Sequence, residues 1–287
     1  EEIGEKWTQA QLHPVDPKII ADGPVHDEVH RGDTLLEHGG FDEFPIPIST
    51  PGWDVAPYLT SGHLVTKDPE TGIRNVGNYR IQVKSPTRLG IYFGGRGDQH
   101  GAIHWRKCRE RNVPFEAAVI IGTAPNISYA AVSKFSYEVD EYTIAGGISG
   151  EPVELVKCKT VNLEVPASAE VVFEGEISLV EVEPEGPFGE AGGFMAQRRM
   201  APVFTLKCIT HRKHPIWQGF ISQLAPSESS KLKQIAWQNN LYAHLRHELN
   251  MPHVFKVAFH DDSPGGGFVV IQMDQADSSE VWKALEA

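Results

Sequence analysis

VPASAEVVFEG (residues 165–175) and EGPFGE (residues 185–190) are the two stretches that decide how this sequence is interpreted. The second stretch places two carboxylates, Glu185 and Glu190, on either side of a turn built from glycine and proline. Because these two residue types restrict the path of the backbone, a fixed turn can direct both carboxylates into one cleft. When two carboxylates lie in unequal environments, one can stay ionised while the other is protonated and acts as a proton donor. On spacing alone, however, a solvated loop in an acidic protein is the more frequent explanation.

The composition limits the classes of function. The chain has 287 residues, with 26 Lys and Arg against 38 Asp and Glu, and its net charge of -12 disfavours nucleic acid as a partner. No apolar run approaches the ~20 residues that a bilayer span needs, and the acidic first residues lack the pattern of a signal peptide. Cys108, Cys158 and Cys208 are odd in number and widely spaced, which is typical of reduced, mostly buried thiols. We therefore expect a soluble, cytoplasmic protein without a membrane span.

The chain divides into three parts. Residues 1–44 are rich in proline and charge, and we expect an irregular connecting segment. Residues 45–226 are rich in β-structure with few helices, which favours a barrel or closed sheet over a doubly wound fold. In residues 203–209, Phe204, Leu206 and Cys208 alternate with polar residues, which predicts one buried face. The predicted strands are residues 79–84, 89–93, 117–121, 171–173, 177–182 and 203–209, with a helix ending near residue 111.

The pattern changes after residue 226. Ser227 and Ser229 offer N-caps, leucines and an isoleucine then recur at near-helical spacing, and Asn250 precedes a proline-containing stop. A glycine-rich turn at residues 263–267 leads to a strand at 268–271 and a helix at 278–285. Residues 227–287 are thus predicted to begin an α/β domain.

Further stretches complete a resemblance: GNYR (77–80), VDEYTIAGGISGEPVELVKC (139–158) and VPASAEVVFEGEI (165–177), followed by EGPFGE. In this order and spacing they resemble the UbiD-type decarboxylases, from about residue 45 to the end of the chain. The resemblance implies a mixed α+β fold. It consists of a split β-barrel, like that of flavin reductases, that binds prenylated FMN, and the start of an α/β oligomerisation domain. It also implies that parts of the family's N- and C-terminal regions, including a lysine for the cofactor phosphate, lie outside residues 1–287.

The resemblance also assigns roles to residues. Arg80, whose guanidinium suits bidentate capture of a carboxylate, would hold the substrate beside the cofactor. Glu185 would pair with Arg80 and orient its guanidinium. Glu190 would donate the proton that replaces carbon dioxide. Asn75, His100 and Glu141 would bind Mn²⁺ or Mg²⁺ at the cofactor phosphate, with K⁺ beside Glu141. Asn78 and Gln99 would contact the flavin. Without the resemblance, Arg80 would be taken as a strand-edge residue and His100 as a structural histidine.

The implied activity is reversible, non-oxidative decarboxylation of an aromatic or α,β-unsaturated acid, or of an aromatic acyl-CoA thioester, through a covalent adduct between substrate and prenylated FMN. The implied partners are a flavin prenyltransferase, which supplies the cofactor, and further copies of the chain in a dimer or hexamer. Two alternatives stay open: a non-catalytic scaffold subunit of a larger carboxylase, and an ordinary flavin oxidoreductase on the same barrel.

Other charged residues carry weaker signals. Arg198 and Arg199 follow the Glu190 turn and suit either an anionic substrate tail or, more often, solvent. The pair His26 and His30 has a spacing that could bind a metal on a helix, but the surrounding glycine and proline make a helix a poor prediction. The segment 211–214 is interpreted as the end of a strand and a solvated turn.

Overall fold

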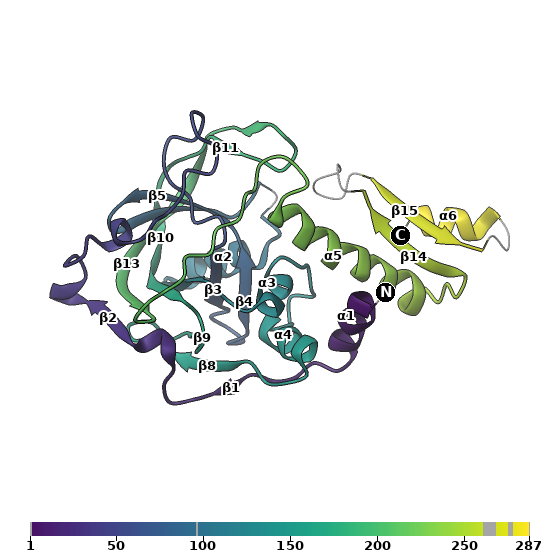
Figure 1. The fold of residues 1–287 in the computed structure, drawn as a ribbon, viewed down its shortest axis with the longest axis horizontal. Helices are drawn as coiled ribbons and strands as arrows, with labels where there is room; N and C mark the ends of the chain where they lie inside the picture. The colour runs from purple at the N-terminus through teal and green to yellow at the C-terminus, as the bar shows by residue number, and fades with distance from the viewer. Residues whose placement is uncertain (1, 96, 261–267, 275–277, 287) are drawn as a thin grey trace.

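The computed structural model describes residues 2–95, 97–260, 268–274 and 278–286 (Figure 1). The helices are α1 (Glu2–Leu12), α2 (His100–Arg111), α3 (Pro125–Ala131), α4 (Glu141–Ser149), α5 (Glu228–Ala243) and α6 (Ser278–Glu286), with shorter helical turns η1 (Pro24–His26), η2 (Gly32–Thr34), η3 (Gly40–Glu43) and η4 (His244–Glu248). The strands are β1 (Lys18–Ile19), β2 (Glu28–Arg31), β3 (His63–Lys67), β4 (Arg74–Asn78), β5 (Arg80–Ser85), β6 (Arg88–Tyr92), β7 (Phe115–Ile121), β8 (Glu154–Lys157), β9 (Glu164–Pro166), β10 (Val171–Glu185), β11 (Phe188–Gly189), β12 (Met195–Ala196), β13 (Arg199–His211), β14 (Val254–Phe259) and β15 (Val269–Met273).

The main sheet curls into a split barrel. Its strands follow the order β4-β3-β7-β10-β13-β6-β5, and β2 pairs with β13. Strands β4 and β5 lie at opposite ends of this order, yet only Tyr79 separates them in the sequence. Because two residues of chain reach about 7 Å at most, the two edges of the sheet must meet at Tyr79. No ladder joins β4 to β5 in the described ranges, so the barrel is open along this seam. The predicted mixed α+β class is confirmed.

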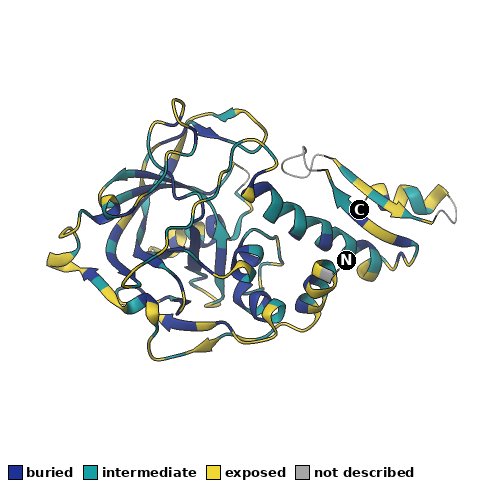
Figure 2. Cartoon of the chain, viewed as in Figure 1, coloured by how far each residue is buried: buried dark blue, intermediate teal, exposed yellow. Residues whose placement is uncertain are grey.

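Strand β7 shows why the sheet has two cores. Val119 and Ile121 belong to the core inside the curled sheet, whereas Ala118 and Ile120 pack outside it in a core shared with α3 and α4. All four side chains are fully buried, because both faces of the strand are covered (Figure 2). This double burial explains the short, continuously apolar run in the sequence.

The alternation predicted for residues 203–209 is interrupted. A register shift between Glu174 and Gly175 of β10 leaves one extra residue in β13, since Glu174 pairs with Cys208 and Gly175 with Leu206. A bulge of this kind exchanges the faces of the residues beyond it. Ile209, and not Cys208, therefore joins Leu206 in the inner core, although Cys208 is buried as well.

The N-terminal segment contains a helix that the sequence analysis did not anticipate. Helix α1 covers residues 2–12, where we expected irregular structure, while the prolines on which that expectation rested all follow the helix. Trp7 and Ala10 on α1 are buried, and the indole Nε1 of Trp7 donates a hydrogen bond of 2.6 Å to Asn240 of α5. Tertiary contacts with α4 and α5 thus stabilise a helix whose own sequence signal is weak.

The region after residue 226 has the elements that the sequence predicts. Ser227 caps α5, accepting a hydrogen bond from the backbone of Ser230, and Asn250 adopts a positive φ of 50° just after η4. Strands β14 and β15 pair, and a separate small core joins them to α6 and η4. The predicted glycine-rich turn at 263–267 lies outside the described residues.

Two predictions from composition can also be compared with the structure. The three cysteines are unpaired, and burial raises the pKa of Cys108 to about 11 and that of Cys208 to about 12. None of the helices in the described ranges combines the length and the apolar character that a bilayer crossing requires.

Candidate functional site

The seam between β4 and β5 opens into a cavity of about 480 Å³. Its wall includes residues of α3 and α5 as well as of the barrel edges, so the cavity lies where α5 approaches the split (Figure 1). Seven of the eight residues that the sequence analysis selected line it: Asn75, Asn78, Arg80, Gln99, His100, Glu141 and Glu190. The eighth, Glu185, lies beside Arg80. Segments far apart in the sequence therefore meet at one cavity.

Arg80 joins the two glutamates of the EGPFGE turn. Its Nε donates to Glu185 Oε1 at 2.8 Å and its Nη2 to Glu185 Oε2 at 2.5 Å, a bidentate pair. Its Nη1 donates to Glu190 Oε1 at 3.0 Å. The side chains are exposed to very different degrees: 0% for Glu185, 8% for Arg80 and 38% for Glu190. One carboxylate is thus a buried anchor, and the other stands at the cavity.

The local backbone fixes this arrangement. Glu185 ends the long strand β10, and Gly186 follows with φ of 95°, a conformation that favours glycine. At Gly189 a Cβ would lie 2.3 Å from Thr50 Oγ1, so a larger residue would displace the turn. These two glycines allow the chain to reverse between the carboxylates.

Two tyrosines that the sequence analysis missed complete the cluster. Tyr58 is fully buried, and its hydroxyl donates a hydrogen bond of 3.0 Å to Glu185 Oε1. Burial and the neighbouring Glu185 raise the pKa of Tyr58 well above its usual value, which keeps the hydroxyl protonated. The Arg80 guanidinium lies 4.4 Å from the ring centroid of Tyr92, within the range of a cation–π contact. Both tyrosines lie far from the motif in sequence, and nothing in their local pattern indicates this role.

The Arg80 guanidinium stays protonated. Burial alone would lower the pKa of this guanidinium, but its hydrogen bonds and attraction to Glu185, together with the charge of Glu190, raise the pKa above the ordinary value. Arg80 is therefore a fixed cation on the cavity wall, held in place by Glu185.

Glu141 is buried on a second side of the cavity. It is the first residue of α4, where Val76 N donates to its Oε2 at 2.8 Å, and it is 4% exposed. Burial raises the pKa of Glu141 to about 8, although the Val76 hydrogen bond opposes the shift. A buried carboxyl with so few partners is suited to a cation as its missing neighbour.

Asn75 and His100 lie on the same cavity wall. Asn75, in β4, is buried, and its Nδ2 donates to the Tyr79 hydroxyl at 3.4 Å. His100 begins α2, and burial, with a smaller contribution from the charge of Lys134, lowers the pKa of its imidazole. The neutral ring that this favours is the form that binds metals. Asn75, His100 and Glu141 together offer oxygen and nitrogen donors.

Polar atoms around the cavity lack partners. The side-chain oxygens Oδ1 of Asn78 and Oε1 of Gln99 are buried without a hydrogen-bond partner among the residues that the structure describes. Buried polar atoms are normally satisfied, so these two indicate a ligand in the cavity. Lys233 and Trp237 of α5 also line it, and the sequence analysis missed both because the helical pattern gave no sign of which face α5 turns to the barrel.

The two arginines after the turn are separated. Arg198 Nε donates to the backbone oxygen of Gly186 at 3.3 Å. Arg199 is exposed and lines a second, open pocket together with Arg80 and Glu190. Arg198 is thus engaged with the turn, and Arg199 is available to a ligand.

Residues 19–224 match the UbiD family model, described as the 3-octaprenyl-4-hydroxybenzoate carboxy-lyase Rift-related domain. An uncharacterized protein of Aquifex aeolicus is 39% identical over 228 residues, 79% of this chain and 45% of the relative. The phenolic acid decarboxylase of Bacillus subtilis is 38% identical over 209 residues, 71% of this chain and 43% of the enzyme. The chain thus spans less than half the length of these relatives.

Solved structures give the same family. The UbiD-class enzyme HmfF from Pelotomaculum thermopropionicum, in complex with prFMN, aligns with a TM-score of 0.88 and 32% identity, covering 99% of this chain and 64% of that one. The vanillic acid decarboxylase of Sedimentibacter hydroxybenzoicus in its closed form aligns with a TM-score of 0.87 and 28% identity, covering 99% and 59%. The matched family model covers most of the chain and includes both barrel edges and the EGPFGE turn, and the chain belongs to the UbiD family.

Proposed function

We propose that this chain provides the cofactor site of a carboxy-lyase that decarboxylates an aromatic or α,β-unsaturated acid with prenylated FMN. The observation that carries the proposal is the Arg80 guanidinium at the cavity wall, shared between a fully buried Glu185 and a partly exposed Glu190. The similarity to the prFMN complex of HmfF and to the phenolic acid decarboxylase supports it.

The cavity residues fit such a cofactor. Asn78 Oδ1 and Gln99 Oε1 are buried and lack partners in the described part of the chain, and a flavin ring edge offers the hydrogen-bond donors that they need. The proposed contacts of the cofactor are Asn75, Asn78, Arg80, Gln99, His100 and Glu141. When bound, prenylated FMN would supply an electron sink for carbon dioxide loss through a covalent bond to the substrate.

Arg80 would hold the substrate carboxylate. Glu185 occupies Nε and one N–H of Nη2, which fixes the plane of the guanidinium, whereas Nη1 contacts only the more exposed Glu190. A substrate carboxylate that takes Nη1 would displace Glu190 from this contact. Glu185 is then the positioning residue, and the orientation that it provides lowers the entropic cost of reaction.

Glu190 would supply the proton. Carbon dioxide leaves with its carboxylate carbon, the bonding electron pair stays with the substrate carbon, and one proton must be delivered to that carbon. Glu190 is the carboxyl group next to Arg80 that faces the cavity, so it can reach a substrate that Arg80 holds. Once displaced from Nη1, the partly exposed Glu190 would first take up this proton from solvent, and release of the product would restore the pairing of its carboxylate with Nη1.

Asn75, His100 and Glu141 would bind Mn²⁺ or Mg²⁺ at the cofactor phosphate, with K⁺ next to Glu141. Their oxygen and nitrogen donors suit hard to borderline divalent ions. Burial favours neutral His100, and a cation would stabilise the ionised form of the buried Glu141. The same cation would neutralise part of the phosphate charge.

The remaining proposals concern substrate, partners and location. Arg199, exposed beside Arg80 and Glu190, would bind an anionic part of the substrate, such as a second carboxylate or a phosphate group of an acyl-CoA thioester. A flavin prenyltransferase as cofactor supplier, a homo-dimer or hexamer, a cytoplasmic location and the reverse carboxylation at high carbon dioxide stay predictions of the resemblance.

Carbon dioxide release tests the proposal. The protein, matured with prenylated FMN and Mn²⁺, should release carbon dioxide from members of a panel of aryl and acrylic acids. Glu190→Gln should abolish release, and the control Glu183→Gln, in β10 and paired with Arg88, should not. Full turnover by Glu190→Gln would refute the proton-donor role. A visible spectrum of ordinary oxidised flavin with hydride transfer would favour an oxidoreductase, and failure to bind either flavin would favour a scaffold subunit.

A further inference from the structure

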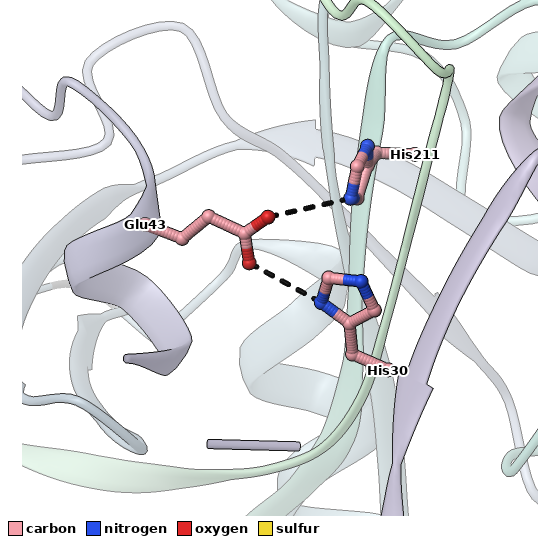
Figure 3. Close-up of side chains that lie close together, drawn as sticks. All are labelled: His30, Glu43 and His211. Atoms are coloured by element: carbon pink, nitrogen blue, oxygen red, sulfur yellow. Dashed lines mark ion pairs between the residues drawn. The ribbon is translucent and has the colours of Figure 1, made fainter. Parts of the chain in front are cut away.

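Three metal-binding side chains meet on the barrel surface away from the seam. His30 lies in β2, Glu43 ends η3 and His211 ends β13, and none of the three lines the cavity (Figure 3). His30 Nδ1 is 3.2 Å from Glu43 Oε2, and His211 Nε2 is 3.5 Å from Glu43 Oε1. The three ligand atoms all lie within 4.8 Å of one another. Figure 3 shows both rings turned toward the one carboxylate.

These atoms are buried without a properly aligned partner. His30 is 9% exposed and His211 6%. His211 ends a strand, as predicted, but the prediction of a solvated turn is wrong at this residue, because the end of β13 pairs with β2 there. Among the described residues, His30 Nδ1, Glu43 Oε2 and His211 Nε2 have no hydrogen bond of acceptable geometry. Buried polar groups are normally satisfied, so a partner is missing at this point.

The proton positions indicate what is missing. His211 Nδ1 lies 2.7 Å from the backbone oxygen of Arg212, and because a carbonyl can only accept, Nδ1 carries the proton. In the neutral ring, Nε2 then carries a lone pair that points toward the Glu43 carboxylate. Two acceptors that face each other need a cation between them, either a second proton or a metal ion. Histidines that bind a metal through one ring nitrogen usually donate the N–H of the other nitrogen to a carbonyl or carboxylate, as His211 does here.

Distance favours the metal ion over the proton. A charge-assisted N–H···O contact usually spans ~2.7–2.9 Å, and both contacts here are longer. Ligands bound at ~2.0–2.1 Å in a tetrahedral site are about 3.4 Å apart. The contact of His30 with Oε2 (3.2 Å) and that of His211 with Oε1 (3.5 Å) are close to this separation, and Glu43 would bind the ion through one of these two oxygens. The ring of His38, 4.9 Å from that of His30, packs on the outer side and helps to hold His30 in place.

We propose that His30, Glu43 and His211 bind one Zn²⁺ or similar divalent transition-metal ion, with water as the fourth ligand. Two imidazoles and one carboxylate are an established zinc ligand set. The ion would join β2 and η3, from the N-terminal segment, to the end of β13, and so fasten that segment to the barrel. This site is separate from the cofactor metal proposed at Asn75, His100 and Glu141.

Cobalt absorption and zinc titration test this site in the whole chain after removal of metal. One equivalent of Co²⁺ should give the intense visible bands of tetrahedral coordination, Zn²⁺ should displace it, and Zn²⁺ should raise the melting temperature of the metal-free protein. Glu43→Gln and His30→Gln should each weaken Zn²⁺ binding at least tenfold. His100→Ala, in the cavity, should leave the bands unchanged. So should His244→Ala, which removes a surface histidine paired with Glu248 but without a third ligand.

Three results would overturn the proposal: the absence of tetrahedral bands in wild type, bands that persist in both Glu43→Gln and His30→Gln, or bands that disappear in His100→Ala. If one of the two variants fails to fold, the other decides the outcome, because His30 and Glu43 lie on separate segments. Circular dichroism in the presence of a chelator establishes which variants fold.

Discussion

Buried ionisable groups are stabilised differently on the two sides of the seam cavity. On the Arg80 side, a guanidinium pairs with Glu185 and Glu190, so the charges compensate one another within the protein. On the Glu141 side, a buried carboxyl has a backbone N–H as its hydrogen-bond donor and a pKa of about 8. The charges on the first side are paired within the protein, whereas the carboxyl on the second side has no cationic partner among the described residues.

This difference indicates the order of assembly. A preformed Arg80 cluster needs no cofactor to keep its geometry, so it can orient a substrate as soon as one enters. In the proposed function, the Glu141 side would become fully stable only when a cation, and with it the cofactor phosphate, is bound. Removal of Arg80 or Glu185 should therefore damage the fold, and removal of Glu141 should mainly damage ligand binding.

Arg80→Ala should have the largest effect. It leaves Glu185 as an uncompensated buried charge, which typically costs about 3–5 kcal/mol of unfolding free energy, and it should abolish carbon dioxide release. Urea unfolding and turnover measure the two effects. The matched control is Arg88→Ala, which removes a more exposed arginine paired with Glu181 and Glu183 and should change both quantities little. A stable, active Arg80→Ala protein would show that the cluster has neither role.

The two carboxylates of the cluster should separate stability from activity. Glu185→Gln leaves buried donors of Tyr58 and Arg80 poorly matched and should cost about 1–3 kcal/mol of unfolding free energy. Glu190→Gln should change stability by less than about 0.5 kcal/mol but reduce turnover by a factor of roughly 10²–10⁴ or more. Thermal unfolding and carbon dioxide release of both variants make the comparison. Equal losses of stability would remove the distinction between anchor and proton donor.

The pH dependence of stability should report on the Glu141 side. The folded pKa of Glu141, about 8, lies above its ordinary value of 4.5, so the folded state binds more protons between these two values. The stabilisation by the protonated form is complete below pH 4.5 and is lost as the pH rises toward 8, by up to roughly 1.4 kcal/mol per pH unit. Glu141→Gln should flatten this part of the metal-free profile, measured by urea unfolding from pH 5 to 9.

Mn²⁺ provides the control for that prediction. Because the proposed ion would bind ionised Glu141, it should stabilise wild type more at pH 8 than at pH 6 and should have little effect on Glu141→Gln. A profile that is the same in the variant and in wild type, with and without Mn²⁺, would contradict the assignment of Glu141.

The smallest effect is expected at the cavity rim. Lys134 lines the cavity, but its side chain is 71% exposed, so its attraction to a cofactor phosphate is screened. Lys134→Ala should weaken FMN binding only a few-fold, and added salt should reduce the difference, as fluorescence titration of FMN would show. The control Lys18→Ala removes an equally exposed lysine far from the cavity lining and should have no effect.

Local patterns were sufficient for much of the fold. The apolar run of β7 and the capping serine of α5 predicted elements that the structure contains, because both signals are local. Helix α1 and the bulge at Lys207 were not predictable, since the first depends on packing against α4 and α5 and the second on the partner strand. Tertiary contacts decided both.

The candidate site divides in the same way. The resemblance indicated Arg80, Glu185 and Glu190, which the structure brings together, because motifs carry residues whose chemistry is specific. Tyr58 and Lys233 were not identified from the sequence. A tyrosine that donates to a distant carboxylate, or a lysine on one face of a helix, leaves no local sequence pattern. The burial of His211 was not predicted, because the sequence gave no sign that β2 would pair with the end of β13.

Anomalous diffraction from crystals of the protein loaded with FMN and Mn²⁺ tests the central claim most directly. The account predicts a manganese peak bound by Asn75, His100 and Glu141 and by the FMN phosphate, with the flavin ring extending toward Arg80 and Glu190. A flavin placed elsewhere, or a phosphate in the cavity with no manganese at these three side chains, would contradict it.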